Sequence, residues 1–584
     1  MKEAIRNRTN FYIFLALILA TSLMFLKKSN IPEVLNNRII PRNLLEQSKK
    51  NYVCDKAGSR LTDKYKSGFN EDSIKKESLS DAQQSIIDFI RDQKYDNIKP
   101  YIKHCAIFIV FIVLDIIFIF LWISYCCCCC CSCCLFSTAE PNRCCSLIFF
   151  LISVICNIIV AIISIIVLGV LNSFFSRLNG VGCSAYYFID HVQLGLAPSY
   201  PNHQSEWEGL NGLITKLRNT QAQANSAKGQ IGTLSVSITA KKDEYGEETQ
   251  CKAQYDALQN NVNDINNLLT DSFDALTDSG AINDLEEVRK TIQDAEDDAG
   301  DTIYDSMHDH TNKWAKRIFI AVFTLTLIFS LLAIVILFLY FCFKSTLFRI
   351  IYVVIWNISM LLMILTILEG VSFGIVGYIF SDAVQVGNYI LSSENLKSTN
   401  PIIFEKSDNY TSNLIDTCAN GDGNFTKVVE GGNKLNQNLE NWKQNRENYI
   451  TTKNNINCPN NTTKTNQLKN YYDQLINVID QSLDMTYNIT NVSCSFAKND
   501  KNIFLNEADT GGIKGIGLCA CSFLVGIFLG ISVVAGILLV HKYQLPSNNN
   551  ERNKNMNNTD VNESRENIRQ GNNAQNPNMM FQNK

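Results

Sequence analysis

The sequence predicts an all-α membrane protein with five transmembrane helices, helical-bundle loops on the outer side and a disordered C-terminal tail. Two observations carry this prediction. Long stretches without charge alternate with segments rich in Asn, Asp, Lys and Gln, so one part of the chain suits lipid and the other suits water. Within the polar segments, apolar residues recur at helical spacing.

Five stretches with almost no charge are long enough to cross the ~30 Å hydrocarbon core of a bilayer, which takes about 20 helical residues. An open sheet cannot satisfy its backbone hydrogen bonds in lipid, so these stretches must be helices. The predicted spanning helices are residues 105–125, 147–172, 318–343, 350–380 and 514–541.

The N-terminus carries a sixth, shorter apolar run at residues 11–26, preceded by basic residues and containing small residues at 20–22. We interpret residues 1–27 as a signal peptide, with an uncleaved anchor as the alternative. In either case the chain from residue 30 onward begins on the outer side of the membrane.

The side of each loop follows from that outer start. Basic residues are typical of inner loops, which fits Lys344 and Arg349 but conflicts with Lys316 and Arg317. The tail is dominated by Asn and has few apolar residues, so it predicts disorder. The outer segments are 28–104, 173–317 and 381–513, and the inner segments are 126–146, 344–349 and 542–584.

Six of the 21 cysteines fall in the outer segments, an even set where disulfides persist. We expect a disulfide between two of the three cysteines in 381–513, and another between Cys183 and Cys251. The six are Cys54, Cys183, Cys251, Cys418, Cys458 and Cys494.

The segment 381–513 also holds six sequons for N-glycosylation, which favours an outer location. Sequons arise by chance in Asn-rich text, as Asn557 and Asn562 show in the predicted inner tail. The six candidate sites are Asn409, Asn424, Asn460, Asn461, Asn488 and Asn491.

A run of cysteines ends the first spanning helix on the predicted inner side. Juxtamembrane cysteines there are natural S-acylation sites, which is the favoured interpretation. A prolonged apolar helix is a second interpretation, and a zinc site completed by Cys144 and Cys145 a third. The acylation candidates are Cys126, Cys127, Cys128, Cys129, Cys130, Cys131, Cys133 and Cys134.

The outer loops have the repeat of amphipathic helices, clearest at 258–276 and 282–303, whose apolar stripes must be buried against each other. The segment 381–513 predicts a second, less regular helical bundle. We expect the outer segments to pack side by side as a stalk. This stalk would continue the second spanning helix beyond Phe174 and join the third at Lys316.

Three polar residues lie within the predicted spanning helices. An ionised carboxylate at Asp115 costs several kcal/mol in lipid, so we expect it to face the helix bundle with Asn157 as its partner. Glu369 lies nearer the outer boundary. An ion or lipid site is one interpretation of these residues, and hydrogen bonding between helices is the favoured one.

The fifth spanning helix carries Ser522, Gly526 and Gly530 at four-residue spacing. Such a small-residue face lets two helices approach closely, within one chain or between two copies of it in a homo-oligomer.

The order of these parts resembles the prominin family. The likeness is carried by residues 96–100, the helix that follows, and the cysteine run 126–134, together with two glycosylated helical loops and a tight inner turn. The resemblance implies a plasma-membrane glycoprotein of microvilli and cilia that associates with membrane lipids, sterol among them. Tweety-type proteins share the five-helix plan but lack such a cysteine run.

Other function classes have weaker support. No catalytic motif occurs, so we expect no enzyme, cofactor or metal site. The net charge of −4 and the lack of a basic stripe give no sign of a nucleic-acid partner. A Tweety-like channel or lipid-transfer protein, and a surface receptor or adhesion protein, remain alternatives to the prominin-like function.

Overall fold

The computed structural model describes residues 42–67, 79–130, 143–195, 207–277, 303–396, 415–427 and 432–542, apart from gaps at 93, 246–248, 344 and 460. Between these ranges it also describes residues 282, 283, 285–290, 293 and 413. The predicted signal peptide, the inner loop from Cys131 and the tail from residue 543 lie outside the described residues.

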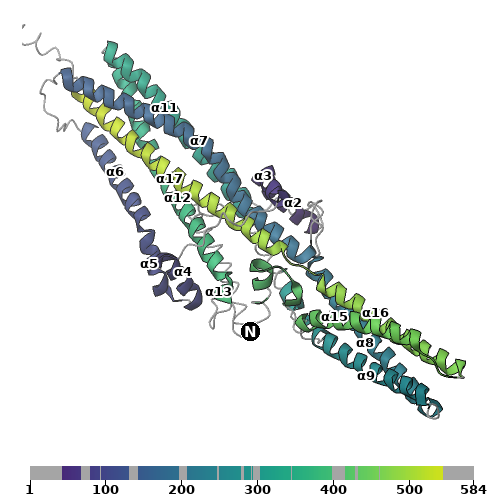
Figure 1. The fold of residues 1–584 in the computed structure, drawn as a ribbon. Coiled ribbons are helices and arrows are strands. Elements are labelled where there is room, and N and C mark those ends of the chain that lie inside the picture. The colour runs from purple at the N-terminus through teal and green to yellow at the C-terminus, as the bar shows by residue number, and fades with distance from the viewer. Residues whose placement is uncertain are drawn as a thin grey trace, which may run out of the picture. The chain divides into compact units, whose positions relative to one another are not determined.

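The described chain is helical, and its one β feature is an isolated bridge between Asn424 and Ser493. Among the described residues, five helices are long and apolar enough to cross a membrane, so the predicted all-α membrane fold is confirmed (Figure 1). They are α6 (Ala106–Cys130), α7 (Arg143–Leu194), α11 (Lys316–Phe343), α12 (Thr346–Ile390) and α17 (Phe496–Lys542).

The chain divides into two compact units, and several of the long helices contribute to both. The larger unit comprises Met1–Asp115, Ile166–Phe323 and Ile367–Phe523. The smaller unit comprises Ile116–Ile165, Thr324–Thr366 and Leu524–Lys584.

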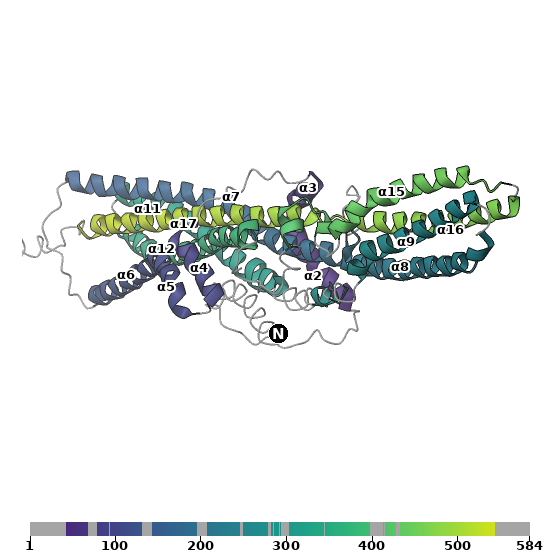
Figure 2. The same cartoon turned by 60° about the horizontal axis from the view of Figure 1, so that its bottom comes forward.

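The larger unit contains a four-helix bundle formed by α8 (Gly209–Thr239), α9 (Thr249–Thr277), α15 (Gly432–Asn455) and α16 (Thr462–Thr490), which lie side by side in Figures 1 and 2. Each helix places its apolar stripe in one shared core. The expected second bundle in 381–513 is therefore wrong, because each hairpin covers its stripe with the other hairpin. Helices of two of the expected outer segments, 173–317 and 381–513, do pack side by side.

Aromatic side chains are buried in this core. Trp442 and Tyr472 are fully buried, as is Tyr245 in the short 3-10 helix η2 (Lys242–Tyr245) between α8 and α9. The Tyr245 ring stacks on Tyr255 with 5.1 Å between centroids, and its hydroxyl donates to Gln467 Oε1 at 3.0 Å.

Two helices of the larger unit run on from spanning helices. The expected continuation beyond Phe174 is confirmed, because α7 is unbroken for 52 residues. The expected join at Lys316 is also confirmed, because the π-helix η3 (Ser306–Ala315) leads directly into α11. A spanning segment of about 20 residues accounts for less than half of α7.

The N-terminal helices of the larger unit are α2 (Arg42–Ala57), α3 (Ser59–Ser67), α4 (Asp81–Asp92) and α5 (Tyr95–His104). A capping box begins α4: Ser80 N–H donates to Gln83 Oε1 at 3.0 Å, and Gln83 N–H donates to Ser80 Oγ at 3.3 Å. Ile87 of α4 then packs in a small core with Val386 and Ile390 of α12.

Helices α12 and α17 approach most closely at three glycines. A Cβ on Gly377 would lie 2.7 Å from Ile516 N and 2.9 Å from Gly512 O, and one on Gly515 would lie 2.9 Å from Gly377 Cα. Because backbone atoms occupy this space, the crossing requires glycine, which has no side chain, at these positions.

The predicted small-residue face of α17 also packs on α12. In the larger unit Ser522 lies against Gly370, and in the smaller unit Gly530 lies against Met363 Sδ. At these two positions the face serves contacts within the chain. The remaining elements are α13 (Ser393–Leu396), the π-helix η4 (Asp416–Asn420) and the 3-10 helix η5 (Phe425–Lys427).

The smaller unit has its own apolar core, which includes the buried side chains of Leu337, Tyr352 and Trp356. Polar contacts cross it as well. Ser153 Oγ and Ser532 Oγ lie 2.9 Å apart, and Asn157 donates to Ser153 O at 2.8 Å and to Ser532 Oγ.

Candidate functional site

Three disulfides join the predicted outer segments. Cys54 of α2 bonds Cys183 of α7, Cys251 of α9 bonds Cys458, and Cys418 of η4 bonds Cys494. All six candidate cysteines are thus used, and among the described side chains no disulfide involves a cysteine predicted to lie inside the cell or in lipid.

The expected bond within 381–513 is confirmed as Cys418–Cys494, whereas the expected Cys183–Cys251 bond is wrong. Cys183 lies where α7 packs on α2, next to the contact that Gly182 makes with Val53. Cys251 instead opens α9 beside the turn before α16.

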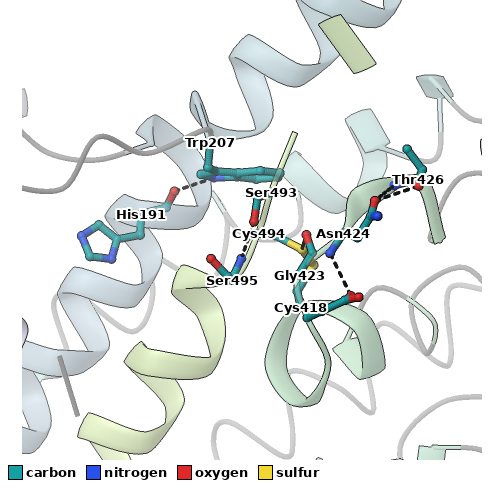
Figure 3. Close-up of a disulfide and its surroundings, with 10 residues drawn as sticks. His191, Trp207, Cys418, Gly423, Asn424, Thr426, Ser493, Cys494 and Ser495 are labelled. Carbon is teal, nitrogen blue, oxygen red and sulfur yellow. Dashed lines mark hydrogen bonds between the residues drawn. A yellow bond between two sulfur atoms is a disulfide. The ribbon is translucent and has the colours of Figure 1, made fainter. Parts of the chain in front are cut away.

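The Cys418–Cys494 bond closes a compact turn near the start of α17 (Figure 3). Cys494 N–H donates to Gly423 O at 2.8 Å, and Gly423 has a φ of 75°. A Cβ on Gly423 would lie 2.4 Å from Ser495 N, so this backbone approach requires glycine.

A buried pair links the end of α7 to the start of α17. His191 Nδ1 and Asp500 Oδ2 lie 2.5 Å apart, and both side chains are almost fully buried. Trp207 Nε1–H donates to His191 O at 2.8 Å, as Figure 3 shows, and the Phe496 ring contacts both the Trp207 and His191 rings. These contacts fix the direction in which α17 leaves the bundle.

A denser cluster of charge surrounds Glu507 of α17. Its Oε1 accepts from Arg60 Nη1 at 2.6 Å, Lys64 Nζ at 2.8 Å and Arg177 Nη1 at 2.8 Å, and the Glu507 side chain is fully buried. Burial lowers the pKa of Lys64, Glu507 offsets part of this effect, and the nearby Arg177 and Arg60 lower it further.

This cluster lies just beyond the apolar part of the helices. Arg177 follows the predicted span 147–172 by five residues, and Glu507 precedes Lys514 by seven. At that boundary Lys514 donates to Ser173 Oγ, and Lys316 donates to Asn172 Oδ1 at 2.7 Å. Polar side chains therefore line the point where these helices leave the predicted membrane.

The two predicted intramembrane carboxylates are both deeply buried, Asp115 at 1% exposure and Glu369 at 5%. Within the part of the chain that the structure describes, neither carboxylate accepts a hydrogen bond. The expectation that Asn157 partners Asp115 is wrong, because the Asn157 amide donates to Ser153 and Ser532 instead. An amide that satisfies its donors on backbone and hydroxyl oxygens has none left for a carboxylate.

The acylation candidates are described only in part. Helix α6 continues through Cys130, so Cys126–Cys130 form its last turns, while Cys131, Cys133 and Cys134 lie outside the described residues. S-acylation of this run stays a prediction.

Four of the six sequons are described, and their glycosylation stays a prediction. Asn488 and Asn491 are exposed at the end of α16. Asn424 Oδ1 accepts from Thr426 Oγ1 at 2.7 Å, and Asn461 caps α16 by accepting from Lys464 N at 3.0 Å. Asn409 and Asn460 lie outside the described residues.

The sequence analysis missed Glu507, Asp500 and His191. Each lies in a long helix among other polar residues, and its partner lies on another helix hundreds of positions away. The available signal was the place of Arg177 and Glu507, each within two turns of an uncharged stretch.

Comparison with protein-family models finds no match for this chain, and comparison with curated proteins finds no significant similarity. Its five long apolar helices mark the chain as a membrane protein.

Proposed function

We propose that the chain is a prominin-like multi-pass glycoprotein that organises protrusions of the plasma membrane, such as microvilli and cilia, in sterol-rich membrane. One observation carries the proposal. Helices α7, α12 and α17 are 52, 45 and 47 residues long, so each extends far beyond a bilayer span into a body braced by disulfides.

The helical body on the outer side and acyl chains on the inner side would act together on the membrane. Helices α7, α12 and α17 each run without a break from a predicted span into this body, so we propose that its lateral size acts on the membrane. Acyl chains on the run 126–134 would add area to the inner leaflet, at ~0.8 kcal/mol for each buried CH₂. An uneven demand for area in the two leaflets favours curved membrane.

Imaging in ciliated or microvillous cells tests this proposal. The tagged protein is expected to concentrate on protrusions, and replacing the cysteines of 126–134 with serine is expected to weaken that enrichment. Cys521→Ser, which removes a cysteine within a span, is the matched control and is expected to change nothing. An even distribution over flat membrane, unaffected by the serine replacements, would contradict the proposal.

A second candidate is a Tweety-like channel or lipid-transfer protein. The observation in its favour is that Asp115 and Glu369 are buried in predicted spans without a hydrogen-bond partner among the described residues. Reconstituted protein would then move ions or lipid between membranes, and Glu369→Gln would change the rate. Gln481→Ala, in the bundle, is the control.

A further inference from the structure

We propose that Arg60, Arg177 and Lys514 form a binding site for a phosphate group at the membrane boundary, and that an anionic lipid headgroup is its natural source. The site belongs to the larger unit, with its residues on α3, α7 and α17. The proposal is independent of the prominin-like function.

The first argument is an imbalance of charge. Three cationic side chains converge on one oxygen of Glu507, and Lys514 adds a fourth positive charge near Ser173. Among the described residues, Glu507 is the only carboxylate that forms an ion pair with Arg60 or Arg177. A partly buried excess of positive charge is costly without a counter-ion.

The second argument is unused hydrogen-bonding capacity. Arg60 Nη2 and Arg177 Nε are buried atoms with no hydrogen-bond partner among the described residues. An unsatisfied buried donor destabilises the fold, and a charged one does so more strongly. Guanidinium donors have the fork geometry that matches phosphate oxygens.

Glu507 is poorly placed to satisfy these donors itself. Its Oε2 also lacks a partner among the described residues, and it is wedged against α7, where a Cβ on Gly180 would lie 2.5 Å away. The Glu507 carboxylate therefore faces its three cations with Oε1 and the backbone of α7 with Oε2. A separate anion must meet the remaining donors.

The third argument is the depth of the site. At ~1.5 Å per helical residue, Arg177 stands roughly 8 Å beyond the span ending at residue 172, and Glu507 roughly 10 Å before Lys514. A headgroup layer occupies about 5–8 Å on each side of the hydrocarbon core. Long cationic side chains can span the few ångströms between these backbone positions and the headgroup layer. The Arg60 and Arg177 side chains keep 32% and 16% exposure, whereas the unpartnered Nη2 and Nε atoms are buried, so the two guanidinium groups must turn outward to meet an anion.

Thermal unfolding of the full-length chain in detergent micelles tests the proposal. A ligand that binds only the native state raises the unfolding midpoint, and the shift grows with the logarithm of the ratio of ligand concentration to Kd. The probes are short-chain phosphatidic acid and inorganic phosphate, with chloride at equal ionic strength as the baseline. Native mass spectrometry counts the bound lipid.

The variants separate binding from folding. Arg60→Gln and Arg177→Gln are each expected to weaken phosphatidic acid binding about tenfold, because each removes a charged hydrogen bond. Lys514→Gln leaves the three cations on Glu507 intact and is expected to weaken binding less. Glu507→Gln is expected to lower stability yet enlarge the shift that phosphate produces, because it removes a competing anion. Arg446→Gln, which breaks a surface pair with Asp480, is the control.

Each outcome is informative. Shifts with both probes, or with phosphatidic acid alone, support a lipid headgroup, and a shift with inorganic phosphate alone supports a soluble phosphate as the source. A shift no larger than that with chloride overturns the proposal. So does full binding by Arg60→Gln and Arg177→Gln, or a smaller phosphate shift in Glu507→Gln.

Discussion

At the crossing of α12 and α17, replacing glycine with alanine is expected to change the free energy of unfolding in opposite directions at two positions of α12. A Cβ on Gly377 would lie 2.7 Å from Ile516 N and 2.9 Å from Gly512 O, which are backbone atoms that cannot rotate away. A Cβ on Gly387 would meet only Leu505 Cδ2 at 3.9 Å, an ordinary contact.

The magnitudes follow from these distances. In a helix interior, alanine is favoured over glycine by about 1 kcal/mol. Gly387→Ala is therefore expected to be neutral or to stabilise by up to about 1 kcal/mol. At Gly377 the two helices must separate, at a cost of about 1–3 kcal/mol or more for overpacking, which cancels or outweighs the same gain. The two variants should differ by roughly 1–3 kcal/mol.

Unfolding in mixed micelles, followed by helical circular dichroism, measures the difference. Gly377→Ala is expected to unfold at a lower denaturant fraction than the wild type, and Gly387→Ala at an equal or higher one. Equal stability of the two variants would refute the close crossing, as would greater stability of Gly377→Ala.

Three further outcomes are expected. Burial raises the pKa of Tyr245 from 10.0 to about 12, so folding stability is lost as pH rises through that window; Tyr245→Phe should lessen the loss in alkaline unfolding curves. Enzymatic deglycosylation should lower the mass of the intact protein, and Asn488→Gln should lessen that shift, whereas a glycan at Asn557 would overturn the topology. Acyl-biotin exchange should label the run 126–134, and stoichiometric zinc in the purified protein would speak against acylation.

Composition and periodicity predicted the spans well, because crossing lipid demands a long uncharged helix whatever its neighbours are. A disulfide within 381–513 was also predictable, because both of its cysteines lie in one segment, although the spacing did not indicate which two of the three would pair. Local rules are sufficient for such features.

Partners on distant segments were not predictable in this way. Nothing in the spacing of Cys251 indicates Cys458, and nothing near Asn157 indicates Ser532. An apolar stripe shows that a helix has a buried face but does not identify the helix that covers it. The single bundle and the Glu507 cluster both depend on that missing information.

The disulfides also impose an order on biosynthesis. If the chain enters the membrane as it is made, Cys183 is synthesised 129 residues after its partner Cys54. Cys458 is synthesised 207 residues after its partner Cys251. Two predicted spans, 318–343 and 350–380, are synthesised during the second wait. A chain that stalls or inserts wrongly in that interval would present Cys251 as an accessible thiol to the oxidoreductases of the lumen. The Cys251–Cys458 disulfide can therefore form only after the predicted span 350–380 has been synthesised.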